Sequence, residues 1–125
     1  MVPLMFLEWK ASFPHYSLTI PCLGPQRPCN NCKLTLNLCN FRCTVLHGGK
    51  TQDVREVSIK GFRDNTFNIL IATDVAGRGI DVPDVTLVVN YDMPNGIEPY
   101  THRIGRTGRA GKKGTAVTFL TMVRD

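Results

Sequence analysis

The chain has 125 residues, of which 42% are hydrophobic and 20% are charged, and its 15 Lys and Arg against 10 Asp and Glu give a net charge of +5. This length suits one domain with a single core and excludes two catalytic domains joined by a cleft. The composition excludes a disordered or collagen-like chain, and no apolar run reaches the roughly 18 residues of a membrane-spanning helix. We therefore expect an intracellular globular protein with no membrane partner.

The first 42 residues predict a divergent, irregular segment. They hold five of the eight prolines and four of the five cysteines. Residues 13–31 show neither a helical nor a strand period, so we expect irregular or disordered chain there. A strand at 2–7 and a helical remnant at 34–38 are the regular structure that this segment predicts.

From residue 43 onward, short apolar runs alternate with helical patterns. We expect helices at 51–62 and 97–105 and strands at 43–46, 67–72, 86–91 and 115–120. In the first helix Thr51 is the expected cap, and the apolar positions are Val54, Val57, Ile59 and Phe62. Runs without alternation are typical of strands covered on both faces. Residues 43–125 therefore predict an α/β domain with a mostly parallel sheet.

The basic residues are concentrated in one segment. Five of the 15 fall within residues 102–113, where there is no acid, and the rest of the chain is balanced. Such a cluster indicates a phosphate-bearing partner, either a nucleotide or a nucleic acid. The alternative is a solvated basic loop without a partner.

Two nucleotide-binding patterns are incomplete in this sequence. Residues 49–51 are the second half of a Walker A loop, but the first glycine would fall at Thr44. The run 77–79 lacks the third glycine of a dinucleotide fingerprint, and Pro83 stops the helix that should follow. The two candidate metal-ligating histidines, His47 and His102, are too far apart to indicate a metal pair. The sequence therefore predicts neither a complete phosphate loop nor a histidine metal site.

The cysteines offer a zinc-dependent interaction module as an alternative. They are arranged as two pairs with the outline of a four-thiolate site, Cys29-x-x-Cys32 and Cys39-x-x-x-Cys43. The spacing between the pairs is shorter than the dozen or so residues of common zinc modules. Cys43 also opens an apolar strand, where a thiol is usually a small core residue. We expect reduced structural thiols and no metal.

Three motifs carry a resemblance to a known family. They are Gln52-x-x-Arg55, the run 72–81 (Ala-Thr-Asp-Val-Ala-Gly-Arg-Gly-Ile-Asp) and the run 102–109 (His-Arg-Ile-Gly-Arg-Thr-Gly-Arg). In this order they resemble the QxxR element and motifs V and VI of the DEAD-box ATP-dependent RNA helicases. The resemblance covers residues 34–121. It implies a RecA-like, P-loop NTPase-type parallel sheet, namely the helicase C-terminal domain, incomplete at both ends.

The resemblance assigns the basic segment to ATP. Arg106 and Arg109 are three residues apart and can point at one anion, and in the family they are the arginine fingers that reach the γ-phosphate. His102 resembles the catalytic-site residue that couples the ATP state to domain closure. Asp81 resembles the carboxylate that binds the ATP ribose. ATP and Mg2+ would be bound mainly by a first RecA-like domain.

The resemblance also implies contacts to RNA and to that first domain. The residues that match the family's RNA-binding positions are Gln52, Arg55, Thr73 and Gly79. Such groups bind sugar and phosphate, so we expect little sequence preference. The positions that match interdomain contacts are Arg78 and Arg103, with a surface ion pair as the alternative for Arg103.

Together these features predict the C-terminal half of an ATP-dependent RNA helicase, a hydrolase only as part of a full-length protein. Neither a Walker A loop nor the sequence Asp-Glu-Ala-Asp occurs in the chain, so we expect it to be inactive alone. Within the family the similarity is greatest to a spliceosomal member, which implies spliceosomal protein partners and a nuclear location. The alternatives are a non-enzymatic RNA-binding or interfering fragment and the zinc-dependent module.

Overall fold

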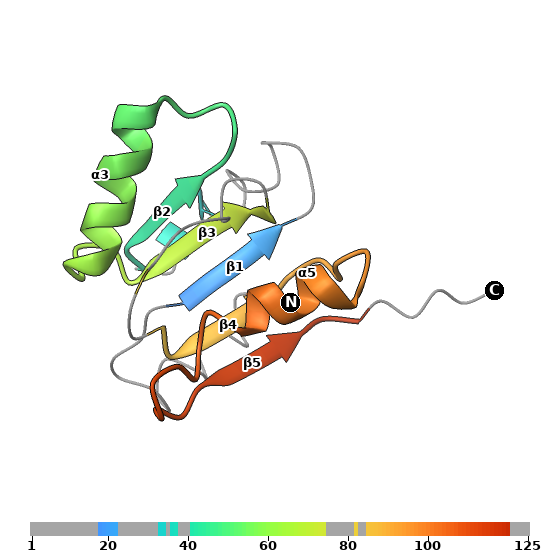
Figure 1. Cartoon of the computed structure of the whole chain (residues 1–125). Helices are drawn as coiled ribbons and strands as arrows, with labels where there is room; N and C mark the ends of the chain where they lie inside the picture. Colours follow the sequence, from blue (N-terminus) through green and yellow to red (C-terminus); the bar gives the residue numbers. More distant parts are fainter. Residues whose placement is uncertain are drawn as a thin grey trace.

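The computed structural model describes residues 18–22, 33–34, 36–37, 41–74, 82 and 85–120. Every strand and helix expected after residue 42 is present, with ends moved by at most two residues. The elements, labelled in Figure 1, are β1 (Leu18–Cys22), β2 (Cys43–Leu46), α3 (Gln52–Arg63), β3 (Ile69–Thr73), β4 (Leu87–Asn90), α5 (Ile97–Ile104) and β5 (Thr115–Thr118).

The strands form one parallel sheet in the order β2-β3-β1-β4-β5. Figure 1 shows the arrows of β1, β2, β3 and β5 pointing the same way, and β4 pairs in parallel with both β1 and β5. The expectation of an α/β domain with a parallel sheet is therefore confirmed. A parallel sheet places the carboxyl ends of all its strands at one edge, which is where the loops that follow them gather.

The central strand β1 corrects the expectation of irregular chain at 13–31. Its residues pair with β3 along the whole strand, from Leu18↔Ile69 to Cys22↔Thr73. Pairing with β4 stops after Thr19, two residues before Pro21. Proline cannot donate a ladder hydrogen bond, so a proline in a short run argues against a central strand. Here the ladder on one side ends before the proline is reached, and the strand is retained.

The other expectations for the first 42 residues have different outcomes. Residues 33–34 and 36–37 are helical, which confirms the remnant within the described positions. The strand expected at 2–7 lies outside the described residues. The division of the chain after residue 42 stays a prediction, although β1 belongs to the same sheet as the later strands.

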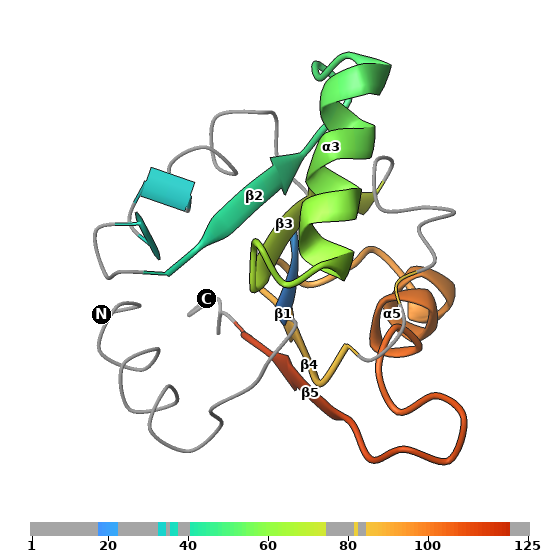
Figure 2. The same cartoon turned by 90° about the vertical axis from the view of Figure 1, so that its left-hand side faces the viewer.

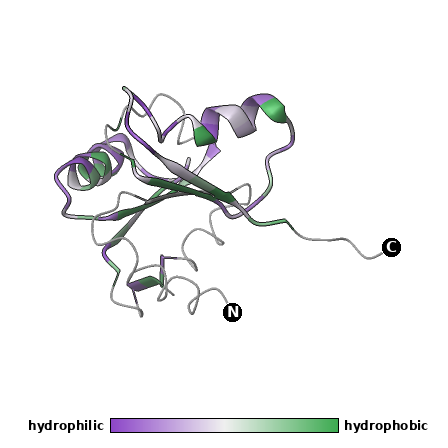
Figure 3. Cartoon of the chain, turned by 90° about the horizontal axis from the view of Figure 1, so that it is seen from below, coloured by the Kyte–Doolittle hydropathy of each residue, from purple (hydrophilic) through white to green (hydrophobic). Residues whose placement is uncertain are grey.

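The two faces of the sheet are covered by different parts of the chain. Figures 2 and 3 show α3 and α5 on one side of the sheet and the helical residues 33–34 and 36–37 on the other. The core on the helix side contains Leu46, Phe62, Leu70, Ala72, Val82, Val85 and Val88. The core on the other side contains Leu36, Phe41, Cys43, Val45, Ile69, Ile71, Leu87 and Val89. Alternate residues of β2, β3 and β4 thus enter opposite cores, which gives the continuous apolar runs seen in the sequence.

The buried side of α3 differs from the one expected. Val54 and Val57 are exposed, at 44% and 68%, while Phe62 and the polar Ser58 are buried. Ser58 Oγ accepts a hydrogen bond from Thr44 Oγ1 of β2 over 2.9 Å. Phe62 and Ile59 pack in the core on the same side of the helix, and Val57 lies off their helical spacing. Thr51 occupies the expected cap position, but its side chain makes no capping bond.

Candidate functional site

The candidate site lies at the carboxyl edge of the sheet. The strands β1 and β4 are neighbours, and the chain continues from β1 toward β2 on one side and from β4 toward β5 on the other. Open α/β sheets bind ligands outside the carboxyl ends of strands at such a switch point. Predicted site residues should therefore cluster at this edge.

Three of the four predicted RNA-binding residues follow neighbouring strands at that edge. Thr73 is the last residue of β3 and is half-buried. Gln52 and Arg55 lie in the first turn of α3, which follows β2. The strands β2 and β3 are neighbours, and their pairing ends at Leu46↔Ala72, so both strands end at the same edge. Gln52 Nε2 donates to Glu56 Oε1 over 3.0 Å on the exposed side of the helix.

A buried histidine shapes the turn that leads into α3. His47 Nδ1 accepts a hydrogen bond from the Gly49 N–H over 3.1 Å, and the His47 carbonyl accepts one from the Lys50 N–H over 3.1 Å. Burial, and then the charge of Lys50, lower the pKa of His47 below 6.5. The imidazole is therefore neutral near pH 7, with its proton on Nε2. This role of His47 was not predicted from the sequence.

Arg103 forms a buried ion pair with Asp74. Its Nε donates to Asp74 Oδ1 over 2.7 Å and its Nη2 to Asp74 Oδ2 over 2.6 Å. Its Nη1 donates to the Asp92 carbonyl over 2.6 Å. The Arg103 side chain is only 4% exposed, so the pair is not the surface ion pair considered as an alternative. Three of the five N–H groups of the guanidinium are thus bound within this domain, and the interdomain role of Arg103 stays a prediction.

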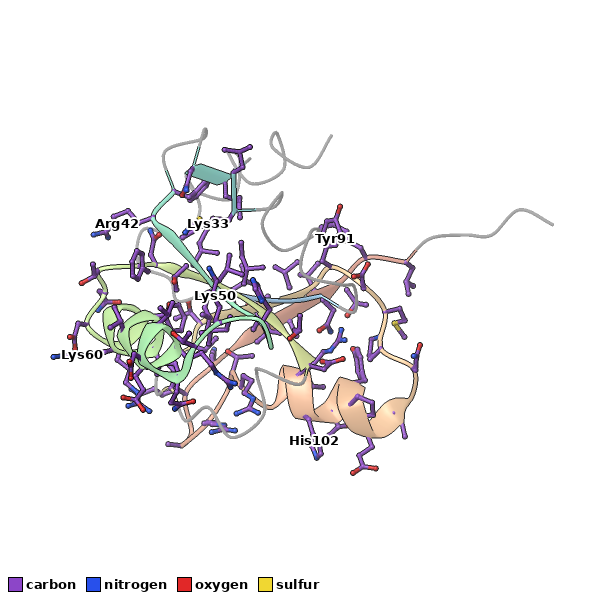
Figure 4. The ribbon with its side chains drawn as sticks, turned by 90° about the horizontal axis from the view of Figure 1, so that it is seen from above. Lys33, Arg42, Lys50, Lys60, Tyr91 and His102 are labelled. Atoms are coloured by element: carbon purple, nitrogen blue, oxygen red, sulfur yellow. The ribbon has the colours of Figure 1, made fainter. Side chains whose placement is uncertain are left out.

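The outer face of α5 carries His102. That residue is exposed, and Figure 4 shows it on the side of α5 that points away from the sheet. Its neighbour Arg103 is buried, because successive helical residues point in different directions. His102 is therefore accessible to another domain, as its predicted role requires.

Arg106 and Arg109 lie in the loop that follows α5, since the helix ends at Ile104. Arg106 is half-buried, and its N–H donates to the Arg103 carbonyl over 3.2 Å. Arg109 is exposed, and its Nε donates to the Gly105 carbonyl over 2.6 Å. Two cationic side chains thus leave one short loop next to the buried Arg103.

This loop is held in a defined conformation. Thr107 Oγ1 donates to the Val85 carbonyl, and the two residues form a parallel bridge. Gly108 and Ala110 have positive φ angles of 70° and 54°, a region that disfavours side chains and that Ala110 tolerates here. Gly114 packs against Thr107 and Gly108 so closely that a Cβ atom would clash with both. The backbone around the two arginines is therefore fixed by packing.

Cys43, one of the four cysteines of the zinc alternative, is a core residue. It is 3% exposed, and its Sγ donates to the Phe41 carbonyl over 3.6 Å. Burial raises the pKa of its thiol to about 12. The side chain of Cys22 and all of Cys29, Cys32 and Cys39 lie outside the described residues. Among the residues that the structure describes, no three His, Cys, Asp or Glu side chains form a possible metal site.

Some predicted positions cannot be placed. Arg78, Gly79 and Asp81 lie outside the described residues. Two partners of Arg103 were not predicted from the sequence, namely Asp74 and the carbonyl of Asp92. An acid directly after a buried strand, inside the run 72–81, was the available signal for Asp74.

In the described part of the chain, no helix is long and apolar enough to cross a bilayer.

Comparison with known proteins decides the family. Residues 26–111 match the family described as "Helicase conserved C-terminal domain". The chain belongs to this family. It is 64% identical over 87 residues to DEAD-box ATP-dependent RNA helicase 21 of Oryza sativa subsp. japonica. It is 60% identical over 85 residues to the pre-mRNA-splicing ATP-dependent RNA helicase prp28 of Schizosaccharomyces pombe.

The fold agrees with this assignment. The crystal structure of the RNA helicase Prp28 from Chaetomium thermophilum bound to ADP superimposes with a TM-score of 0.82 at 48% identity, and the match covers 94% of this chain. The DEAD-box resemblance and the RecA-like C-terminal fold are therefore confirmed. The match to the Oryza protein covers 70% of this chain and 12% of that protein. The match to the Schizosaccharomyces protein covers 68% of this chain and 13% of that protein. The superposition on the Chaetomium structure covers 28% of that structure. This chain thus corresponds to one small part of longer enzymes.

Proposed function

We propose that this chain acts as the C-terminal half of an ATP-dependent RNA helicase. It binds the RNA backbone and presents arginines to ATP that a first RecA-like domain holds. The observation that carries this proposal is the bidentate bond between Arg103 and Asp74, which holds the segment 102–109 against the end of β3 beside Thr73. The two motifs with predicted ATP and RNA roles are thereby joined in one site.

The nucleotide part of the site suits a polyphosphate. ATP would supply a transferable γ-phosphoryl group, on whose oxygens negative charge is spread during transfer. Arg106 and Arg109 offer charge-assisted donors from one loop, and the Nε of Arg109 donates to the Gly105 carbonyl. Asp81 is proposed to bind the ribose. As the family resemblance implies, Mg2+ would be bound with ATP mainly by the first domain.

The RNA part of the site suits the sugar-phosphate backbone. Thr73 offers a hydroxyl at the end of β3, and Gln52 and Arg55 offer an amide and a guanidinium at the start of α3. We assign Gly79 to the same surface through its backbone N–H. Contacts of this kind carry no base information, so affinity should depend on salt and little on sequence.

RNA binding by the chain tests this part of the proposal. Fluorescence anisotropy with a labelled single-stranded oligouridine should show weak, salt-sensitive binding. Arg55→Glu should weaken it, because a charge reversal replaces attraction to phosphate by repulsion. The matched control is Arg42→Glu, an exposed arginine just before β2 and thus at the opposite, amino edge of the sheet. Equal loss of affinity in both variants would point to non-specific electrostatics and contradict the proposed site.

The names of the relatives suggest a biological setting. Several are called pre-mRNA-splicing helicases. We therefore propose a role in splicing in the nucleus, with spliceosomal proteins as partners. A non-enzymatic interfering fragment would use the same RNA surface. It differs in one respect, since it would never support ATP hydrolysis when joined to a first RecA-like domain.

A further inference from the structure

The buried Arg103 joins two strands that are not neighbours in the sheet. Its guanidinium binds the carboxylate of Asp74, directly after β3, and the carbonyl of Asp92, two residues after β4. The strand β1 lies between β3 and β4. One side chain therefore bridges the carboxyl edge across the central strand, at the switch point where open α/β sheets bind their ligands.

The ends of this bridge belong to different parts of the proposed site. Asp74 directly follows Thr73, which is assigned to RNA. Arg103 lies three residues before Arg106, which is assigned to ATP, and the Arg106 N–H bonds to the Arg103 carbonyl over 3.2 Å. A shift of the backbone at Thr73 is therefore passed through one ion pair to the base of the arginine loop.

The bond between Asp74 and Arg103 can transmit such a shift. Two parallel N–H···O bonds between a planar guanidinium and a planar carboxylate fix their direction as well as their distance. The Arg103 side chain is 4% exposed, so separation would leave a charge in the protein interior. Asp74 and Arg103 are expected to move together, because breaking their ion pair would cost free energy.

We propose, on the basis of the function proposed above, that Arg103 is a positioning residue that couples RNA binding at Thr73 to the placement of Arg106, acting through Asp74. Arg103 contacts neither RNA nor ATP in this role. It makes the position of the arginine loop relative to the end of β3 depend on whether RNA is bound there, while the loop keeps its own conformation.

Nuclear magnetic resonance of the 15N-labelled chain tests this coupling. Single-stranded oligouridine should shift the amide signals of Thr73 and Arg106 together in the wild-type chain. In Arg103→Lys the shift at Thr73 should persist and the shift at Arg106 should be lost. Lysine keeps the charge but cannot hold both Asp74 oxygens and the Asp92 carbonyl with one planar fork. Asp74→Asn, which keeps the shape and loses the charge, should behave in the same way.

Controls separate coupling from folding and from RNA binding. Arg42→Lys changes an exposed arginine at the amino edge and should leave both shifts intact. A dispersed spectrum shows that a variant is folded. If both site variants unfold, the side-chain signal of Arg103 Nε–H in the wild-type chain tests the coupling, because this group bonds to Asp74. RNA should shift this signal together with the Thr73 amide signal. A shift of the Thr73 signal without a shift of the Arg103 Nε–H signal overturns the coupling.

The other outcomes are distinct. A shift at Arg106 that persists in folded Arg103→Lys overturns the coupling but leaves the proposed RNA site intact. No shift at Thr73 in the wild-type chain refutes the proposed RNA site and, with it, the coupling that rests on it.

Discussion

The buried hydroxyl pair between β2 and α3 gives a quantitative prediction about stability. Thr44 Oγ1 donates to Ser58 Oγ over 2.9 Å, and both residues are buried. Replacing Ser58 by alanine leaves the Thr44 hydroxyl without its acceptor, which costs about 1–3 kcal/mol. For a domain of this size about 1 kcal/mol lowers Tm by roughly 4 °C, so Ser58→Ala should lower Tm by about 4–12 °C.

The double replacement makes the prediction specific to the pair. Thr44→Val together with Ser58→Ala removes both polar groups at little cost in shape, and such a replacement is nearly neutral. The double variant should therefore be more stable than Ser58→Ala alone, as measured by urea unfolding followed by circular dichroism. Thr115→Val on the exposed strand β5 is the control. Losses that simply add in the double variant would show that the two hydroxyls do not interact, and would refute the reasoning.

Three further outcomes follow from burial. Cys43 should resist alkylation by iodoacetamide at about pH 8 until the chain unfolds, because burial raises the pKa of its thiol to about 12. Mass spectrometry locates the label, and labelling of Cys43 in the native chain would contradict this prediction. His47 should lower the free energy of unfolding as the pH falls through 6.5 and should have no such effect well above pH 6.5. The reason is that the unfolded chain binds a proton at His47 near pH 6.5, whereas burial lowers the pKa of His47 in the folded chain. His47→Gln should flatten this part of the pH profile. Phe62→Ala should lower the free energy of unfolding, measured in urea, by about 3–5 kcal/mol, and Val57→Ala should lower it by less than about 0.5 kcal/mol. Similar losses in the two variants would contradict the buried side of α3 described above.

The elements after residue 42 could be predicted because local sequence and fold agree there. Buried parallel strands need continuous apolar runs, and the four runs are separated by helices or turns. The strand β1 could not be predicted, since Pro21 opposes a central strand in any local reading. Its pairing depends on β3 and on where the β4 ladder ends, and neither is visible in residues 18–22.

The sequence motifs predict functional roles for Thr73, His102, Arg106 and Arg109, and these roles stay predictions. The structure adds where the residues lie: Thr73 ends β3, and the other three lie on or directly after α5. The burial of Arg103 could not be read from the sequence, because it depends on a carboxylate 29 residues away. The expected burial of Val57 was wrong, because the less exposed side of α3 follows residues 55, 58, 59 and 62, and Val57 lies off this helical spacing.

ATP hydrolysis by a two-domain enzyme tests the central claim most directly. This chain, fused to the first RecA-like domain of a Prp28-type relative, should hydrolyse ATP in the presence of RNA, while each part alone should not. Arg106→Lys or Arg109→Lys should lower the rate by about 10³-fold or more, the range for loss of an arginine finger, with Arg42→Lys unchanged. RNA-stimulated hydrolysis by this chain alone, or a fusion unaffected by both arginine variants, would contradict the account.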